Sequence, residues 1–137
     1  MKKIFLFIAF VGIITACENR SLDKSSFQTM ASLKERIFKY GDKKAYEELK
    51  TLMVDYPVED MLFWSLIMAN KHSFHQANLD VFYAIVLGYV SEIDRFYEMD
   101  ERSQALAKGY LVMAKDQGVA GASEIYNDLQ AKIHVVK

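Results

Sequence analysis

Histidines are the first candidates for metal or acid–base chemistry in this chain, which contains three of them. His72 and His75 are three residues apart, but they fall on either side of an expected turn between two helices. His134 has no acidic residue at a ligand spacing, and the sequence has neither a His-Glu-x-x-His motif nor a pair of cysteines. We therefore expect polar turn residues at these positions, with no metal site and no cofactor.

Nucleophiles and paired carboxylates give no stronger indication of catalysis. Ser65 lies in the most apolar stretch and lacks the Gly-x-Ser-x-Gly setting of a nucleophile elbow. Adjacent acidic residues point to different sides of a helix, so we expect them to act as N-terminal charges or to face solvent. These acidic pairs are Glu47-Glu48, Glu59-Asp60 and Asp100-Glu101. The sequence therefore predicts that the protein is not an enzyme.

The first seventeen residues have the order of a secretory signal peptide. Lys2 and Lys3 form a basic start, residues 4–16 are apolar or small, and the single cysteine, Cys17, follows directly. This apolar run is shorter than the roughly 20 residues that a membrane-spanning helix needs. Cleavage after Ala16 would make Cys17 the first residue of the mature chain.

The segment Ile14-Thr15-Ala16-Cys17 resembles the lipobox of bacterial lipoproteins. The resemblance implies that residues 1–16 are removed, that the Cys17 sulfur carries a diacylglycerol and that the new amine is acylated. It thus implies a cell-envelope protein anchored to the lipid bilayer, with residues 17–26 as a polar tether. Glu18 is not the aspartate associated with inner-membrane retention, so the outer membrane is favoured, on either its periplasmic or its surface face.

Composition restricts what the remaining domain, residues 27–137, can do. The whole chain has 17 Lys and Arg against 18 Asp and Glu, a formal net charge of −1, and we expect no nucleic-acid partner. Because the single cysteine lies in the lipobox, the domain has no disulfide and must be stabilised by packing of its aromatic and aliphatic side chains.

From residue 26 onward the apolar spacing is helical, and the sequence predicts an all-α fold. Gly41 is a natural helix C-cap, Asp42 a natural N-cap, and Pro57 a helix end. Residues 61–69 are apolar on nearly every side, which is typical of a buried helix. The expected helices are residues 27–40, 42 up to Pro57, 59–71, 74–87, 100–117 and 120–134, with a looser insert at 89–99.

Two segments 45 residues apart, 68–77 and 113–122, share a pattern of small residues. Each has a Met-Ala pair whose alanine is followed, eight positions later, by another alanine. Residues 41–45 form a partial third copy, with the same step from glycine to alanine as residues 118–122. Small residues beside a tight turn allow antiparallel helical hairpins to pack closely. An ordinary helical bundle is the alternative, and both are all-α.

The segment from Ala114 to Ala122 resembles the turn of a Sel1-like repeat, a relative of the tetratricopeptide repeat. The resemblance covers residues 41–129, although the glycine expected near Ser73 is absent. It implies a short solenoid in which the first helix of each hairpin lines a concave groove. The residue after each marker alanine, and the residue four positions further, would face that groove. These candidate partner-binding residues are Tyr46, Lys50, Asn78, Phe82, Ser123 and Asn127.

The sequence thus predicts a lipid-anchored, non-catalytic scaffold that binds a protein or peptide through exposed aromatic and amide groups. The alternative is that Tyr46 and Phe82 belong to the core. Neighbouring aromatics at 63–64, 82–83 and 96–97 suggest that one of each pair is buried while the other faces outward. Two other functions stay open: a periplasmic immunity or inhibitor protein directed against a toxin, and an envelope hydrolase, which would need a cleft with a titratable group of shifted pKa.

Overall fold

The computed structural model describes residues 24–54, 58–89 and 93–133, and all regular elements within these ranges are helical. The predicted all-α class is therefore confirmed. The signal peptide, Cys17, most of the tether and His134 lie outside the described residues. The helices are α1 (Lys24–Tyr40), α2 (Lys43–Leu52), α3 (Val58–Leu66), α4 (His75–Tyr89), α5 (Glu101–Asp116) and α6 (Ala122–Ile133), with a π-helical turn η1 (Ile67–Lys71) and a 3₁₀-helix η2 (Ile93–Glu98).

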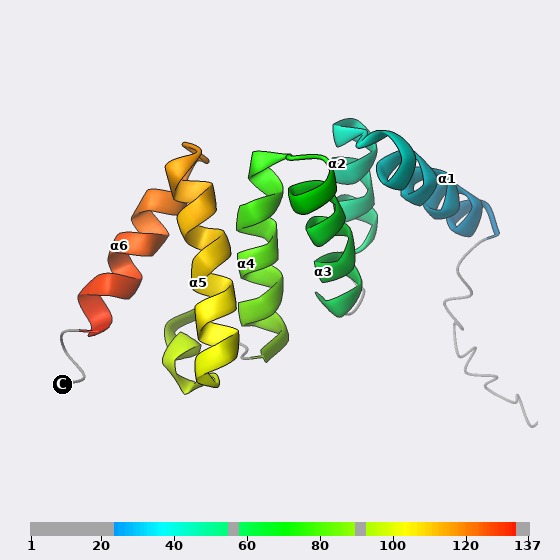
Figure 1. The fold of residues 1–137 in the computed structure, drawn as a ribbon. Coiled ribbons are helices and arrows are strands. Elements are labelled where there is room, and N and C mark those ends of the chain that lie inside the picture. Colours follow the sequence, from blue (N-terminus) through cyan, green and yellow to red (C-terminus); the bar gives the residue numbers. More distant parts are fainter. Residues whose placement is uncertain (1–23, 55–57, 90–92, 134–137) are drawn as a thin grey trace, which may run out of the picture.

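The helices follow one another across the molecule in chain order, from α1 at one end to α6 at the other (Figure 1). Helix α1 packs against α2, α3 against α4, α4 against both α3 and α5, and α6 mainly against α5. Two buried clusters form the core. One is built mainly from α1, α2 and η1, with Ala77 at the start of α4, and the other from the rest of α4 with η2, α5 and α6. Ala69 of η1 packs against both clusters and so connects them.

Two helix starts follow directly from capping side chains. The Asp42 carboxylate accepts a hydrogen bond from the Ala45 backbone N–H at 3.0 Å and begins α2. That N–H and the paired Arg36 guanidinium, 2.6 Å away, lower the pKa of Asp42. Asp100 begins α5 in the same way, because its side chain accepts from the backbone N–H groups of Arg102 and Ser103.

Three turns that join helices into hairpins share one backbone conformation. The turn residue has a positive φ in each: 61° at Gly41, 51° at Ser73 and 72° at Gly118. Ser73 thus adopts the left-handed conformation that usually favours glycine. Four residues after each turn residue stands a fully buried alanine that lets the next helix approach closely. These alanines are Ala45, Ala77 and Ala122.

The final helical turn before Ser73 contains one residue more than the final helical turn before Gly118. The Ala114 carbonyl accepts from Val119 N at 2.9 Å, whereas the Met68 carbonyl accepts from Phe74 N at 2.9 Å, one residue further along the chain. The π-helical turn η1 contains the extra residue. Met68 and Ala114 are both fully buried, while Ala69 is only half-buried. The predicted pairing of Ala69 with Ala114 is therefore wrong by one residue.

Helix α3 is not covered on all sides, contrary to the sequence prediction. Phe63 is 52% exposed, and Trp64 beside it is half-buried. Helix α3 packs mainly against α4 and η1, and the side that carries Phe63 is left exposed. The two rings contact each other edge to face, with their centroids 5.0 Å apart.

Replacing Gly41 by alanine is expected to cost more stability than the same change at Gly118. A Cβ at Gly41 would lie 2.5 Å from His72 Cγ, whereas one at Gly118 would meet no atom within 4 Å. Both glycines have a positive φ, which costs alanine about 1–2 kcal/mol. Overpacking at Gly41 adds about 1–3 kcal/mol. Urea unfolding of the two variants measures the difference, and equal losses would contradict the close contact between the first turn and His72.

Candidate binding site

The predicted exposed row of aromatic residues is wrong. Tyr46 and Phe82 are both 0% exposed and belong to the core. The predicted positions do not face a groove, because neighbouring helices cover both side chains. Phe82 packs in the cluster that contains α4, η2 and α5, and Tyr46 packs in the cluster that contains α1, α2 and η1. Two neighbouring aromatic pairs follow the expectation only in part, because Phe82 and Phe96 are buried but the tyrosine after each of them is half-buried and does not face fully outward.

The four polar members of the predicted set have different surroundings. Asn78 is 5% exposed, and its Nδ2 donates to Gln117 Oε1 at 2.7 Å, so this amide is committed within the fold. Ser123 and Asn127 are exposed on α6. Lys50 is half-buried and ion-paired to Asp80. The six residues therefore do not lie together on one surface.

Tyr46 is instead the centre of a polar network between α2, α3 and α4. Its hydroxyl lies 2.8 Å from Ser65 Oγ and donates to Asp80 Oδ2 at 2.9 Å. Since the tyrosine proton goes to Asp80, the Ser65 hydroxyl donates to Tyr46. Lys50 Nζ donates to both Asp80 oxygens, at 2.9 and 3.0 Å. Burial, together with the Asp80 charge, raises the pKa of Tyr46. Ser65, considered above as a nucleophile, is a buried structural partner here.

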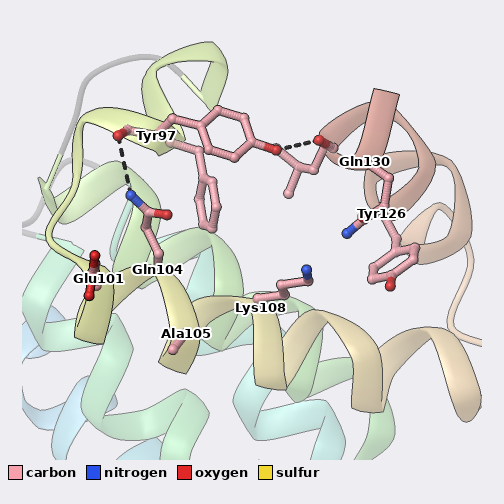
Figure 2. A pocket seen from close by; sticks show the side chains of 9 residues that line it. Tyr97, Glu101, Gln104, Ala105, Lys108, Tyr126 and Gln130 are labelled. Atoms are coloured by element: carbon pink, nitrogen blue, oxygen red, sulfur yellow. Dashed lines mark hydrogen bonds between the residues drawn. The ribbon is translucent and has the colours of Figure 1, made fainter. Parts of the chain in front are cut away.

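A pocket of about 210 Å³ lies between η2, the first half of α5, and α6 (Figure 2). We call it the α5–α6 pocket. Aromatic and aliphatic side chains form its walls, and charged and amide groups stand among them. Its lining residues are Phe96, Tyr97, Glu101, Gln104, Ala105, Lys108, Tyr126, Leu129 and Gln130.

Hydrogen bonds hold the elements around the α5–α6 pocket in place. The Tyr97 hydroxyl donates to the Leu129 carbonyl and so connects η2 to α6 across the pocket (Figure 2). Gln104 Nε2 donates to the carbonyls of Tyr97, at 3.2 Å, and Met99, at 2.7 Å, and so fixes η2 on α5. Burial raises the pKa of Tyr97, because it disfavours the phenolate.

Two lysine side chains lie near the Tyr126 ring on the α6 side of the pocket. Lys108 Nζ lies 5.9 Å, and Lys115 Nζ 5.3 Å, from the ring centroid. Both distances fit cation–π attraction. Lys115 also forms an ion pair with its neighbour Asp116 at 2.6 Å. Lys108 forms neither a hydrogen bond nor an ion pair with any described residue.

A second hollow of about 210 Å³ lies among α2, α3 and α4. Val54 and Leu87 stand exposed at its edge. Three of its polar groups, Lys50, Asp80 and Ser65, belong to the Tyr46 network and are hydrogen-bonded within it, and Tyr83 also lines the hollow. The lysine of this hollow is therefore paired with an acidic residue, whereas Lys108 of the α5–α6 pocket has no acidic partner among the described residues.

Groups suited to metal or acid–base chemistry do not gather in the described part of the chain. No cluster of three or more His, Cys, Asp and Glu residues there could hold a metal ion. Glu35, whose pKa is lowered by Lys39, and Asp42, whose pKa is also lowered, line neither pocket. His72 lies beside Gly41, with its Nε2 3.2 Å from the Phe38 carbonyl oxygen, and His75 is exposed.

The α5–α6 pocket was not predicted, because two of its lining residues, Phe96 and Tyr97, lie in residues 89–99, for which the sequence predicts a loose insert. The one available signal was the adjacent pair Phe96-Tyr97. Within the described ranges, no helix combines the length and the hydropathy that crossing a bilayer requires. No protein-family model, curated protein or solved structure matches this chain.

Proposed function

We propose that this protein is a non-catalytic binding protein of the cell envelope, anchored to the lipid bilayer through acylated Cys17. Its α5–α6 pocket would hold a segment of a partner protein. The leader supports the first part, since a basic start, a short apolar run and a small-residue end stand directly before the single cysteine. The pocket supports the second part, since aromatic walls beside a few polar groups are typical of anchor sites in protein recognition.

The size of the pocket favours a single anchoring side chain as its occupant. Its volume of about 210 Å³ is below the roughly 300–1,000 Å³ of sites for small-molecule ligands. A side chain inserted from a partner segment would contact Tyr97, Tyr126 and Leu129 and leave its own backbone at the rim. This observation carries the proposal.

The proposal includes a repeat architecture of Sel1-like or tetratricopeptide-like hairpins. Support comes from the three turns with the same left-handed residue and from the buried alanine four positions after each. Within the described residues α6 packs mainly against α5, and the α5–α6 pocket lies where α6 meets η2.

Filling the pocket is expected to abolish partner binding without unfolding the protein. Ala105 lines the pocket and is exposed, so Ala105→Trp places an indole in the space that the anchor side chain would occupy. The matched control is Ala31→Trp, at an exposed alanine of α1. After chemical crosslinking in intact cells, the partner is identified by purifying the full-length protein. Loss of that partner with Ala105→Trp alone supports the proposal, and its retention contradicts it.

A further inference from the structure

We propose that the α5–α6 pocket selects a partner segment in which an aspartate or glutamate adjoins a large apolar side chain. Lys108 would bind the carboxylate while the aromatic walls take the apolar side chain. This inference rests on the proposed function and specifies the chemistry of the partner.

Lys108 is the cation that the fold leaves available at this pocket. Its Nζ has the Tyr126 ring as its neighbour at 5.9 Å and no acidic partner among the described residues. The cations of two other sites are paired with acidic residues: Lys50 with Asp80 at 2.9 Å, and Arg36 with Asp42 at 2.6 Å. The two hollows have equal volumes, but the lysine of the other hollow is already neutralised.

Gln130 adds a second polar group on the same side of the pocket. Figure 2 shows its amide and the Lys108 ammonium both directed into the pocket, from α6 and α5. The Gln130 side chain forms no hydrogen bond with a described residue. A carboxylate between the two groups would accept a charge-assisted hydrogen bond from Lys108 and a second hydrogen bond from the amide.

Glu101 determines where along the pocket the acidic group can lie. It precedes Lys108 by seven residues on α5, which corresponds to about 10 Å along the helix axis. A carboxylate would be repelled at the Glu101 end and attracted at the Lys108 end. The apolar side chain then falls beside it, against Phe96, Tyr97 and Leu129.

The groups that point into the pocket favour a side-chain carboxylate over a chain terminus. Terminal carboxylates are commonly captured by concave sets of backbone N–H groups. Here the donors that Figure 2 shows directed into the pocket are side chains of two helices. An internal acidic residue next to an anchor is therefore the occupant that fits.

The test compares three labelled peptides on full-length protein reconstituted in lipid nanodiscs. Each peptide is N-acetylated and C-amidated, with a Phe-Asp, Phe-Asn or Ala-Asp pair in a Gly-Ser background. Fluorescence anisotropy, with empty nanodiscs as the blank, gives the Kd values. We expect Phe-Asp to bind about fivefold more tightly than Phe-Asn and at least about tenfold more tightly than Ala-Asp. The preference over Phe-Asn should become smaller between about 0.1 M and about 1 M salt, because the Debye screening length falls from about 10 Å to about 3 Å.

Two variants test whether Lys108 causes the preference for Phe-Asp over Phe-Asn. Lys108→Met should bind Phe-Asp and Phe-Asn equally, whereas Lys44→Met, at an exposed lysine of α2, should keep the preference. The inference is overturned if the wild type does not distinguish Phe-Asp from Phe-Asn, if Lys108→Met still does, or if no peptide binds. In any of these cases, loss of the cellular partner with Ala105→Trp would leave the proposed function standing.

Discussion

Replacing Tyr46 by alanine is expected to lower the free energy of unfolding by about 3–5 kcal/mol, the range for removing a buried aromatic ring. This is a large share of the 5–15 kcal/mol that stabilises an ordinary domain. Tyr46 is 0% exposed and contacts the Phe74 ring edge to face, with 6.0 Å between centroids. Its hydroxyl joins α2 to Ser65 of α3 and Asp80 of α4. The change would therefore leave both a cavity and unpaired polar groups.

The controls for Tyr46 separate the ring from the hydroxyl. Tyr46→Phe keeps the ring and removes one partner of Ser65 and Asp80, so we expect a loss of about 1–3 kcal/mol. Tyr40→Ala removes a side chain that is 76% exposed and should stay within about 0.5 kcal/mol of the wild type. Urea unfolding followed by circular dichroism measures all three. A loss at Tyr46→Ala no greater than at Tyr40→Ala would contradict the buried network.

The same hydroxyl gives the stability a dependence on alkaline pH. Burial and the nearby Asp80 raise the pKa of Tyr46 above the value of about 10 in an unfolded chain. The unfolded state therefore loses this proton first. The contribution of the neutral phenol is complete below about pH 10 and falls above it, by up to about 1.4 kcal/mol per pH unit. Tyr46→Phe should have a shallower slope, to which Tyr83, Tyr97 and Lys115 still contribute because their pKa values are also raised.

Replacing Cys17 by alanine is expected to move the protein from the membrane fraction to the soluble fraction. Each CH₂ of a buried acyl chain contributes about 0.8 kcal/mol, and two chains or more give stable anchoring. An alanine has no sulfur to carry a diacylglycerol, so the variant would lose these chains. Fractionation with immunoblotting measures the distribution, and intact mass shows whether lipid is attached. Ser21→Ala, in the polar tether, is the matched control and should stay with the membrane.

Membrane association of the Cys17→Ala protein at the wild-type level, with an unmodified mass, would contradict the lipid anchor. It would not bear on the α5–α6 pocket, because the pocket is built from residues 96–130 alone. The anchor and the pocket are thus separately testable parts of the proposed function.

Local signals explain why the helices could be predicted from the sequence. Asp42 and Asp100 each begin a helix through a side-chain hydrogen bond to nearby backbone N–H groups. Gly41 and Gly118 end helices because each has a positive φ, a backbone conformation that glycine adopts more readily than other residues. Each signal acts within a few residues, so a single sequence suffices to recognise it.

Register and burial depend on contacts that a local pattern does not contain. The extra residue in η1 moves Met68, rather than Ala69, into the buried position. Tyr46 and Phe82 follow the expected spacing, yet neighbouring helices cover them. The α5–α6 pocket needs Tyr97 to be brought against Leu129 of another helix, and nothing close in sequence encodes that contact.

Photo-crosslinking from inside the α5–α6 pocket tests the central claim most directly. Benzoylphenylalanine is introduced in place of Ala105 or, as the control, of Ala31, and intact cells are irradiated. We predict a covalent adduct of defined mass from position 105, none from position 31, and an adducted partner peptide identifiable by mass spectrometry. Equal adducts from both positions, or none from position 105, would contradict the assignment of the pocket as the partner-binding site.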